Sequence, residues 1–343
     1  MSSPSGTGIR TSAGPSPSVP SRRRRVRLGV AEIGFVGVGL LTVPDLLGID
    51  RVTPLAQLVS FRPYVLVGVA ALVVVLVGLS WRNRRLLLPA VALLVVLAVG
   101  VVMTVPRTRA EPSPVGGRPL TVLAVNVLDG AADVTALAEL IRDERPDLGA
   151  LIEVGPWYRD RLAPLVEPLG YRFVTATGTD SDGVTDVFGV SALVAAHLGD
   201  VTVTIDESRP FPSVGIAGGG LGAMRFVAYH AVAPRPGDVS QWSTDLGELT
   251  RYCAGGTPTI VAGDFNATLD HSRLREVTAG CSDAATQRGQ GLAPTWPAWM
   301  PDWFGAQIDH VFVTPPIAAE EFAVRELAGS DHRAVLVRLR VPQ

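Results

Sequence analysis

The sequence predicts an α/β (α+β) fold in which stacked mixed β-sheets, covered by helices, follow three transmembrane helices. Long apolar runs fill residues 26–105, and from residue 120 onward short β-branched segments alternate with a few amphipathic ones. Charge divides the chain at the same place. Residues 1–110 contain 13 of the 30 basic and 3 of the 32 acidic residues, so residues 111–343 hold 17 and 29, a net charge of −12. An apolar, basic part therefore precedes a soluble, acidic domain.

The N-terminal tail, residues 1–25, is rich in Ser, Pro, Gly and Thr and ends in four consecutive arginines. It contains almost no large apolar side chains, so burial cannot offset the entropy that ordering would cost. We therefore expect a disordered cytoplasmic tail.

Three apolar runs follow, at about residues 28–47, 64–81 and 86–105. Each is near the roughly 20 residues that span a bilayer. The second and third runs contain no charge and no polar stripe at a period of 3.6, which disfavours core helices of a soluble protein. The first run carries Glu32, Pro44 and Asp45, and a cleavable signal peptide competes for it. Because no small-x-small cleavage site follows it and two further runs do, we interpret it as a retained helix.

Arginines in the short flanks predict the orientation. They precede the first run (Arg22 to Arg25 and Arg27) and fill the tight loop before the third (Arg82, Arg84, Arg85), whereas the 45–63 connection has only Arg51 and Arg62. The positive-inside rule places the tail and the tight loop in the cytoplasm. Three spans then deliver the following domain to the extracytoplasmic side of the cell membrane, with the lipid bilayer as a partner. Residues 106–119, rich in Pro and Gly, are expected to be an extended linker.

The soluble domain, residues 120–343, shows the periodicities of a strand-rich fold with a few helices. Predicted strands lie at 120–128, 148–154, 171–176, 186–196, 200–206, 223–230, 258–263, 308–314 and 333–340. Predicted helices lie at 133–145, 157–168 and 239–253, and Pro146 ends the first of them. No internal repeat is visible.

Polar residues at the ends of these strands are the candidates for a functional site. They are Asn126, Glu153, His230, Asp264, Asn266, Asp309, Asp331 and His332. A lone residue of this kind is more often a turn former or a solvated group, so the set matters more than its members. In GDFNATLD, Asp264 and Asn266 are two positions apart at the tip of an apolar strand, so both can point to one site.

The order of these blocks, with GDFN and GSDH the most specific, resembles the endonuclease/exonuclease/phosphatase superfamily of the deoxyribonuclease I-like fold. The resemblance covers residues 120–340. It implies a four-layer sandwich of two mixed sheets flanked by helices, with a site at one end. It also implies that Glu153, Asn126 and Asp331 lie at the metal.

The same resemblance implies catalytic roles for the other candidates. Asp264 would orient and deprotonate the attacking water, and Asn266 would contact the phosphate. Asp309 would pair with His332, which together with His230 would contact the scissile phosphate. Oxygen ligands favour Mg²⁺ or Mn²⁺ over Zn²⁺.

Three further observations bound this interpretation. His310 follows Asp309 within a strand and should face away by alternation, and His271 lies outside the set, so His271→Ala should be nearly neutral. The stretch FGVSALVAAH lacks the Ser-Arg that many members of the superfamily carry there.

Two classes of function remain. The first is a metal-dependent phosphoester hydrolase, whether phosphodiesterase, nuclease or phosphatase. The second is a catalytically silent membrane protein that binds or organises the envelope. Among substrates, the domain charge of −12 argues against extended duplex binding, and a small phosphoester or lipid head group fits better. Protein partners are not predicted.

Aromatic and sulfur residues add two open questions. Trp296, Trp299 and Trp303, interleaved with proline, either pack over the sheet end or form a rim that touches substrate or the membrane interface. Cys253 and Cys281 either form one disulfide, consistent with an oxidising compartment, or are two buried thiols.

Overall fold

Two six-stranded mixed β-sheets form the centre of the protein. The computed structural model describes residues 34, 37–39, 41–178 and 186–343. The first sheet has the order β11-β12-β1-β2-β4-β3. Its strands are β1 (Arg118–Asn126), β2 (Leu148–Ile152), β3 (Tyr171–Thr177), β4 (Gly189–Ala195), β11 (Ala318–Arg325) and β12 (Ala334–Val341). Only β1 and β2 pair in parallel, and the other neighbours in this sheet are antiparallel.

The second sheet has the order β5-β6-β7-β8-β10-β9. Its strands are β5 (Thr202–Asp206), β6 (Ser213–Ala217), β7 (Arg225–His230), β8 (Thr259–Asp264), β9 (Ser282–Asp283) and β10 (Asp309–Val313). Here β7 and β8 are the parallel pair. Each sheet therefore contains one parallel pair, and the carboxyl ends of its two strands lie at the same edge.

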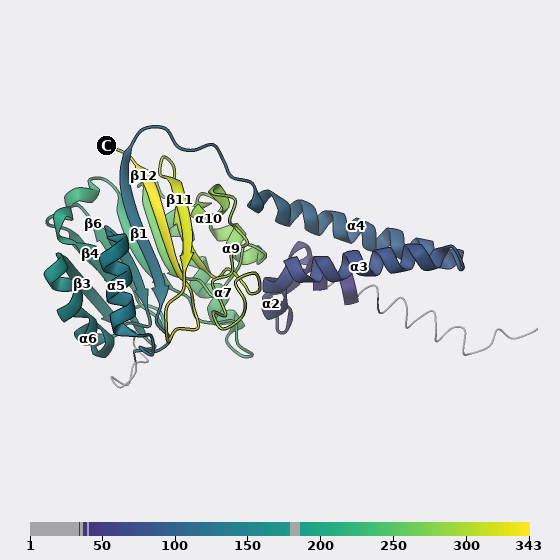
Figure 1. Cartoon of the computed structure of the whole chain (residues 1–343), viewed down its shortest axis with the longest axis horizontal. Coiled ribbons are helices and arrows are strands. Elements are labelled where there is room, and N and C mark those ends of the chain that lie inside the picture. The colour runs from purple at the N-terminus through teal and green to yellow at the C-terminus, as the bar shows by residue number, and fades with distance from the viewer. Residues whose placement is uncertain (1–33, 35–36, 40, 179–185) are drawn as a thin grey trace, which may run out of the picture.

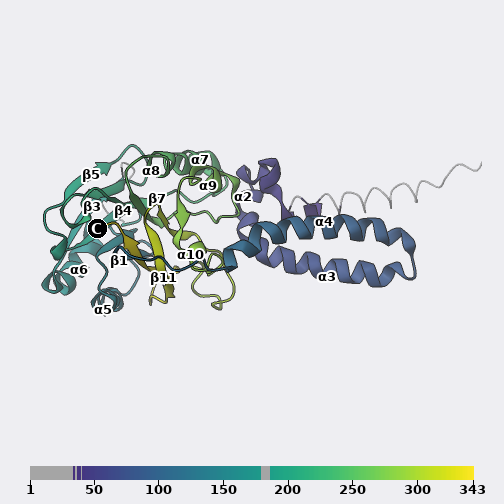
Figure 2. The same ribbon diagram turned by 90° about the horizontal axis from the view of Figure 1, so that it is seen from above.

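Helices cover the outer face of each sheet, giving four layers (Figures 1 and 2). The helices beside the first sheet are α5 (Val134–Glu144) and α6 (Pro156–Val166), and those of the second part are α7 (Val239–Gly247), α8 (Thr250–Cys253), α9 (Ser272–Val277) and α10 (Ala284–Gln287). Short 3₁₀ turns complete this domain at Glu167–Leu169, Ala196–Leu198 and Gly219–Leu221.

Strand β1 shows how alternation builds these layers. Leu120, Val122 and Ala124 point into the core between the sheets, whereas Leu123 and Val125 pack toward α5 and α6. Because both faces of the strand are buried, its sequence is apolar almost throughout. The four-layer arrangement predicted for residues 120–340 is confirmed.

Several predicted elements differ in detail. The helix expected at 239–253 is two helices, α7 and α8, and Arg118 rather than Leu120 begins β1. Strands β6, β9 and β11 were not predicted. β11 lies at a sheet edge, where Glu320 pairs with Arg340 at 2.8 Å. Because an edge strand tolerates charged residues, its acidic sequence does not show the apolar pattern by which strands are predicted.

The two cysteines form a disulfide. Cys253 ends α8 and Cys281 follows α9, and their sulfur atoms are bonded across a sequence separation of 28 residues. The bond closes a loop that contains β8 and the GDFN segment. Of the two alternatives left open by the sequence, the disulfide is confirmed.

Two long antiparallel helices project from the domain as a hairpin (Figures 1 and 2). They are α3 (Arg62–Ser80) and α4 (Leu87–Thr104), joined by the 3₁₀ turn Arg84–Leu86. Their 19 and 18 residues correspond to about 28 and 27 Å, near the hydrocarbon thickness of a bilayer. Among the described residues, two helical stretches, Leu55–Ser80 and Arg84–Thr108, are long and apolar enough to cross a membrane.

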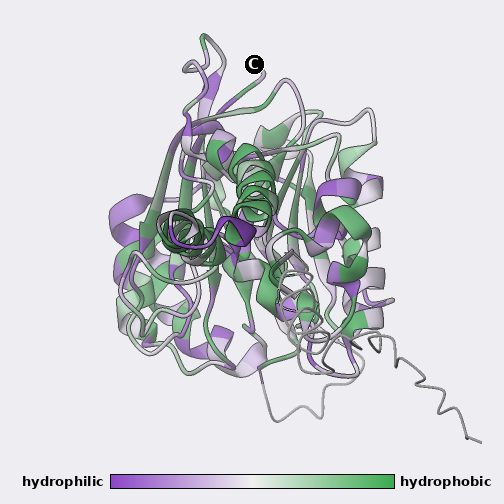
Figure 3. Ribbon diagram, turned by 90° about the vertical axis from the view of Figure 1, so that its right-hand side faces the viewer, coloured by the Kyte–Doolittle hydropathy of each residue, from purple (hydrophilic) through white to green (hydrophobic). Residues whose placement is uncertain are grey.

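Both helices of the hairpin consist almost entirely of hydrophobic residues, as their green colour in the end-on view shows (Figure 3). A small core of Val69, Val73 and Leu93 joins the helices to each other, while residues such as Val74 and Leu88 point outward and are exposed. A helix that is apolar on all sides needs an apolar surrounding. These helices correspond to the second and third predicted spans.

The first predicted span, residues 28–47, lies mostly outside the described residues. Where the chain is described, the helix ends at Thr42 and Pro44–Leu47 form a separate 3₁₀ turn, so the predicted end at Leu47 is wrong. Pro44 stops the helix, and Asp45 is buried against the domain. Three spanning helices are therefore not shown.

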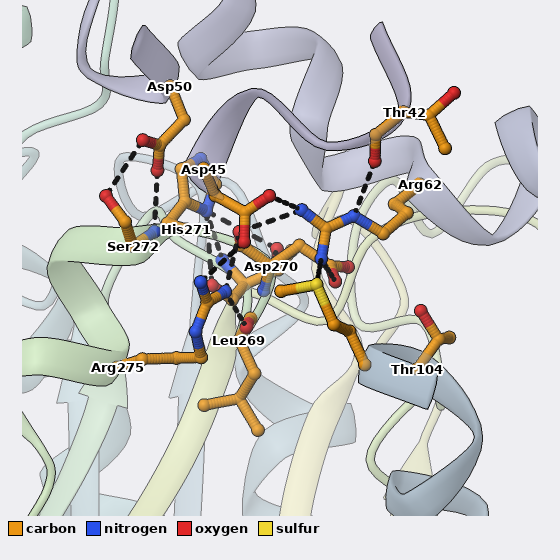
Figure 4. A network of polar contacts seen from close by, with 12 residues as sticks. Thr42, Asp45, Asp50, Arg62, Thr104, Leu269, Asp270, His271, Ser272 and Arg275 are labelled. Atoms are coloured by element: carbon orange, nitrogen blue, oxygen red, sulfur yellow. Dashed lines mark hydrogen bonds and ion pairs between the residues drawn. The ribbon is translucent and has the colours of Figure 1, made fainter. Parts of the chain in front are cut away.

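A buried polar network joins the base of the hairpin to the soluble domain (Figure 4). Arg62, at the start of α3, forms ion pairs with Asp45 and with Asp270, the latter at 3.0 Å. Arg107 pairs with the same Asp270, and Arg275 pairs with Asp45. The side chains of Arg62, Asp45 and Asp270 are almost fully buried, so these charges depend on one another.

Residues 49–61 add further contacts at the same junction. They form the 3₁₀ turns Ile49–Arg51 and Val59–Phe61 and the short helix α2 (Leu55–Leu58). Asp50 accepts hydrogen bonds from the backbone and hydroxyl of Ser272, at 2.6 and 2.8 Å. His271 is buried and lies 2.7 Å from the Ala56 carbonyl, which makes it a structural residue and unsuitable as a neutral control.

The predicted linker, residues 106–119, is only partly free of the domain. Val105–Thr108 form a 3₁₀ turn, Ala110 pairs with Arg288 in a β-bridge, and the Glu111 amide donates to the Gln287 carbonyl at 2.8 Å. The hairpin is therefore docked on the domain and not merely tethered to it.

Candidate functional site

The ends of four central strands bring the predicted site residues together. Asn126 ends β1, His230 ends β7, Asp264 ends β8 and Asp309 begins β10. The register pairs Asp264 with His230 on one side and with Asp309 on the other. Asp264 is therefore at the centre of the cluster.

Asp264 is buried and receives hydrogen bonds from two asparagines. Its carboxylate accepts from the backbone of Asn266 at 2.8 Å and from the side chain of Asn126 at 3.1 Å. Burial raises the pKa of Asp264, as does the neighbouring Asp309 carboxylate, while His332 opposes the shift. A carboxylate whose basicity is raised in this way suits the acceptance of a proton from water.

Glu153 follows β2 directly and is held in an unusual backbone conformation. Its φ is 60°, a left-handed value that is uncommon for a residue other than glycine, and Asn266 has a φ of 48°. The Glu153 carboxylate accepts from Asn126 Nδ2 at 3.0 Å and from the Asp129 amide at 2.5 Å. Burial is the main cause that raises its pKa.

Asn126 holds Glu153 and Asp264 together through its amide nitrogen. Its Oδ1 accepts from the Leu128 amide at 2.9 Å, which fixes the side-chain orientation. In this arrangement the nitrogen, not the oxygen, faces the carboxylates. Asn126 therefore positions Glu153 and Asp264, and its place among the metal ligands stays a prediction.

His332 and Asp309 form a hydrogen-bonded pair. His332 Nδ1 lies 2.9 Å from Asp309 Oδ2, and Nε2 lies 3.8 Å from Asp264. Burial opposes protonation of His332, but Asp309 and Asp264 outweigh it and raise its pKa to about 10. His332 is thus a cation at neutral pH and presents an N–H into the site.

His230 is the second imidazole at the site and differs in charge. Its Nε2 lies 3.9 Å from Asp264, and its ring stacks on Phe211 at a centroid distance of 3.9 Å. Burial lowers the pKa of His230 well below its usual value, and the nearby His332 and Arg209 lower it further. His230 is therefore neutral.

Asp331 closes the site on the side of the last strand. Its Oδ2 accepts from the indole Nε1 of Trp296 at 3.1 Å, and its Oδ1 lies 3.9 Å from His332 Nε2. Among the described residues, Asp331 Oδ1 and Asp309 Oδ1 are buried without a hydrogen-bond donor. Such oxygens call for a positive partner.

The charges of the site favour a divalent cation. Glu153, Asp264, Asp309 and Asp331 provide four carboxylates, and only His332 among the predicted residues is cationic. Ligand atoms of Asp264, Asp309 and His332 all lie within 4.8 Å of one another. Glu153 and Asp331 add oxygen donors beside this group, and oxygen donors suit Mg²⁺ or Mn²⁺. The residues present fit such an ion.

His310 lies outside this cluster, as alternation along the strand predicts. Its Nδ1 contacts Asp283 at 3.0 Å and its Nε2 contacts the Ala267 carbonyl at 3.0 Å, on the other face of the second sheet. Asn266, in contrast, lies at the site and donates from Nδ2 to the Ala231 carbonyl at 3.0 Å.

Sequence reasoning missed several supporting residues. Arg209 donates to the His230 carbonyl at 3.0 Å, and its guanidinium lies 4.2 Å from the centre of the Tyr229 ring. Ser330 donates to the Asn126 carbonyl at 2.7 Å and accepts from the His332 amide at 2.9 Å. Ser330 could have been found because it belongs to the GSDH motif, whereas no pattern in the sequence marks Arg209.

We expect the His332 imidazole to stay protonated well above pH 6.5 in the metal-free protein. Because its pKa is raised from 6.5 to about 10, its ion pair stabilises the fold fully below pH 6.5 and is lost as pH rises through about 10. NMR of histidine-labelled full-length protein in EDTA measures this, with the signal assigned by the His332→Gln variant. Asp309→Asn should shift the titration downward. A His332 signal that titrates near 6.5 in the unsubstituted chain contradicts the ion pair.

This geometry combines the parts that phosphoester hydrolysis requires. Asp264 is a buried carboxylate of raised basicity, His332 is a cationic donor 3.8 Å away, and Glu153 and Asp331 offer cation ligands. A proton acceptor, a donor to developing negative charge and a divalent ion together stabilise the transition state of phosphoryl transfer.

The comparisons with known proteins agree with the fold. An endonuclease/exonuclease/phosphatase protein from Beutenbergia cavernae DSM 12333 superposes with a TM-score of 0.51 and 20% identity, over 66% of this chain and 72% of the other. Truncated TDP2 from Caenorhabditis elegans gives 0.51 and 18%, over 65% and 98%. D. rerio TDP2 complexed with a single-strand DNA product gives 0.50 and 16%, over 65% and 99%.

No curated protein matches the chain in sequence. The family described as Endonuclease/Exonuclease/phosphatase matches residues 123–332, which span every predicted site residue from Asn126 to His332. This match covers more than half of the chain. The protein is therefore a member of the endonuclease/exonuclease/phosphatase family.

Proposed function

We propose that this protein is a divalent-metal-dependent phosphoester hydrolase. The observation that carries the proposal is the buried cluster of Asp264, Glu153 and the His332–Asp309 pair, at the end of the two sheets. Proteins of this family are phosphoesterases, nucleases and phosphatases. The retention of all these groups favours an enzyme over a catalytically silent binding protein.

Each residue has a part in the proposed reaction. Glu153 and Asp331 would hold Mg²⁺ or Mn²⁺, with Asn126 orienting Glu153; when bound, the ion supplies positive charge to the phosphate oxygens. Asp264 accepts the proton of the attacking water. His332 donates a hydrogen bond to the phosphate oxygens in the transition state, and Asp309 holds its imidazole in place.

Metal removal tests this proposal. We expect full-length protein in detergent to hydrolyse bis-p-nitrophenyl phosphate with Mg²⁺ or Mn²⁺, and EDTA to abolish the reaction, because four carboxylates would then lack their cation. Activity should return on adding either ion in excess. A reaction that is indifferent to EDTA contradicts the metal role. No hydrolysis of any phosphoester, with a fully folded protein and added metal, favours the silent binding protein.

We further propose that α3 and α4 anchor the domain outside the cytoplasmic membrane. Arg82, Arg84 and Arg85 occupy the tip of the hairpin, where the positive-inside rule places cytoplasmic residues. The opposite end of both helices meets the catalytic domain. The Cys253–Cys281 disulfide also suits an oxidising compartment.

A reporter fusion tests this topology. Alkaline phosphatase fused after Gln343 should be active in cells, because it folds only where its own disulfides form. A cytoplasmic reporter fused at the same position should be inactive. The reverse pattern places the domain in the cytoplasm.

A further inference from the structure

A tryptophan-rich loop links the base of the hairpin to the site. The loop runs from Trp296 to Phe304, with the sequence WPAWMPDWF, and we call it the Trp loop. It lies between the ends of the strands and the base of α3, on the side of the domain that faces the hairpin (Figures 1 and 2). It is therefore one part of the domain that contacts both the proposed site and the proposed membrane anchor.

One end of the Trp loop is fixed to a site residue. The Trp296 indole donates to the Asp331 carboxylate at 3.1 Å, and the Ala298 amide donates to the Asp331 carbonyl at 2.7 Å. Arg333, the second residue after Asp331, donates to the carbonyls of Ala298 and Met300 at 3.1 and 2.6 Å. The first end of the loop thus adjoins the site, whereas Trp299 and Trp303 lie farther along it.

The other end of the Trp loop is fixed to the hairpin. Tyr64, in the first turn of α3, accepts from the Gly305 amide at 2.8 Å, and its hydroxyl lies 3.0 Å from the Trp303 carbonyl. Phe304 packs on Tyr64 and Phe61, with ring centroids 4.5 and 6.0 Å apart. These contacts hold the loop at the depth where the candidate spanning helix begins.

Between these fixed ends, the loop presents two tryptophans to the outside. Trp299 is 75% exposed and Trp303 is 70% exposed, and Pro297 and Pro301 stiffen the backbone between them. Large exposed indoles are costly in water but favourable at the head-group level of a bilayer. The buried ion pairs of Arg62 keep the hairpin and the domain in a fixed relation, so the indoles have a fixed depth.

We propose that the Trp loop lies in the membrane interface and that the substrate is a phosphodiester of a membrane phospholipid. This rests on the proposed hydrolase and on its membrane anchoring. The loop that would seat in the interface is bonded to Asp331 through Trp296, so a lipid phosphate held at the interface would lie close to the site. A lipid that diffuses in the same bilayer is already concentrated near the site, so it needs no long-range electrostatic attraction. A domain with a net charge of −12 could therefore still meet such a phosphate substrate. Nucleic acid, which depends on positive surface, is disfavoured.

The reaction is balanced by water alone. The water oxygen forms a bond to phosphorus while its proton passes to Asp264, one P–O ester bond breaks, and the leaving oxygen takes a proton from solvent. A phospholipid diester and water thus give a phosphomonoester and an alcohol.

The test uses the full-length chain in nanodiscs of phosphatidylethanolamine and phosphatidylglycerol with Mg²⁺. In the same sample, lipid cleavage is followed by mass spectrometry, and bis-p-nitrophenyl phosphate and single-stranded DNA are assayed separately. The variants are Trp299→Ala/Trp303→Ala, the conservative Trp299→Phe/Trp303→Phe, and the control Trp157→Ala, which removes an exposed indole on α6. Thermal unfolding is measured for each variant.

We expect lipid cleavage to fall about 10-fold in the alanine pair, because the loop then no longer holds the domain against the lipid interface. The phenylalanine pair should retain most of the lipid activity, and Trp157→Ala all of it. Hydrolysis of the soluble diester should change by less than about 2-fold in every folded variant.

Each contrary result has its own meaning. Cleavage of the soluble diester without lipid cleavage overturns the lipid proposal and leaves the hydrolase intact, as does faster cleavage of DNA than of lipid. Equal loss of lipid and soluble activity in the folded alanine and phenylalanine pairs also overturns it, because the loop would then act within the site. Absence of all three activities refutes the hydrolase and, with it, the lipid substrate.

Discussion

Asp264→Asn is expected to lower the turnover of a phosphodiester by at least about 10²-fold while leaving the protein as stable as before, or more stable. The substitution keeps the size of the side chain but removes the proton acceptor. The pKa of Asp264 is raised by burial and by Asp309, so its charged form is disfavoured in the folded state. At a pH above the pKa of Asp264 in the folded protein, the buried carboxylate is charged. Replacing it with a neutral amide therefore removes an unfavourable contribution to the free energy of folding. Loss of activity with an unchanged or higher Tm separates chemistry from misfolding.

Glu153→Gln should also lose activity and keep its stability, but here the activity is lost because the cation is bound less well. The pKa of Glu153 is also raised by burial, and the variant loses the charge that would bind the cation. We expect excess Mg²⁺ to restore part of the activity of Glu153→Gln and none of that of Asp264→Asn. His197→Ala is the control, because His197 is exposed and its imidazole lies 2.8 Å from Asp147, which is not a site residue. Full activity in both site variants would show that the chemistry lies elsewhere.

The sequence predicted which polar residues lie close together, because the cluster is built from strand ends. Asn126, Glu153 and Asp264 each end an apolar, β-branched segment, and such segments become central strands whose carboxyl ends converge. Side-chain orientation could not be predicted in the same way. The side-chain amide of Asn126 is oriented by a hydrogen bond from the Leu128 backbone amide. The position of that backbone amide depends on the folded turn. The contact of Trp296 with Asp331 joins residues 35 positions apart.

Edges of the sheets were harder to predict than their centres. β11 contains the consecutive acidic residues Glu320 and Glu321, because it lies at an edge and pairs with only one neighbour. It therefore lacks the continuous apolar pattern of β1. β6 contains Gly215 and only five residues, too few for a clear period. Both strands are defined by their tertiary pairing rather than by local sequence.

The docking of the hairpin on the domain could not be predicted from local patterns either. Asp45 was an irregularity in an apolar run, and Asp270 lay beyond the GDFN motif without a role. The structure pairs both with Arg62 across separations of 17 and 208 residues. Charges in apolar segments are costly when unpaired, so each of these residues has a partner elsewhere in the chain.

Asp270→Asn is expected to destabilise the full-length protein by about 3–5 kcal/mol, the usual cost of removing one partner from a buried ion pair. Asp270 contacts both Arg62 and Arg107, so the variant leaves two buried guanidinium groups with less negative charge. Chemical unfolding of the protein in detergent measures this loss. The control is Arg51→Met, which breaks an ion pair with Glu276 whose side chains are 38% and 55% exposed. That change should cost less than about 1 kcal/mol.

A double-mutant cycle determines whether the ion pair itself is responsible. If it is, Asp270→Asn combined with Arg62→Met should cost less than the sum of the single changes, because Arg62 no longer needs its partner. The effect should also reach the catalytic domain, since Asp270 lies six residues after Asp264 in the loop that begins at the site. We therefore expect one cooperative unfolding transition, with hydrolysis lost at the same denaturant concentration. Additive costs, or a catalytic domain that unfolds independently of the Asp270 variant, would show that the hairpin is only a tether.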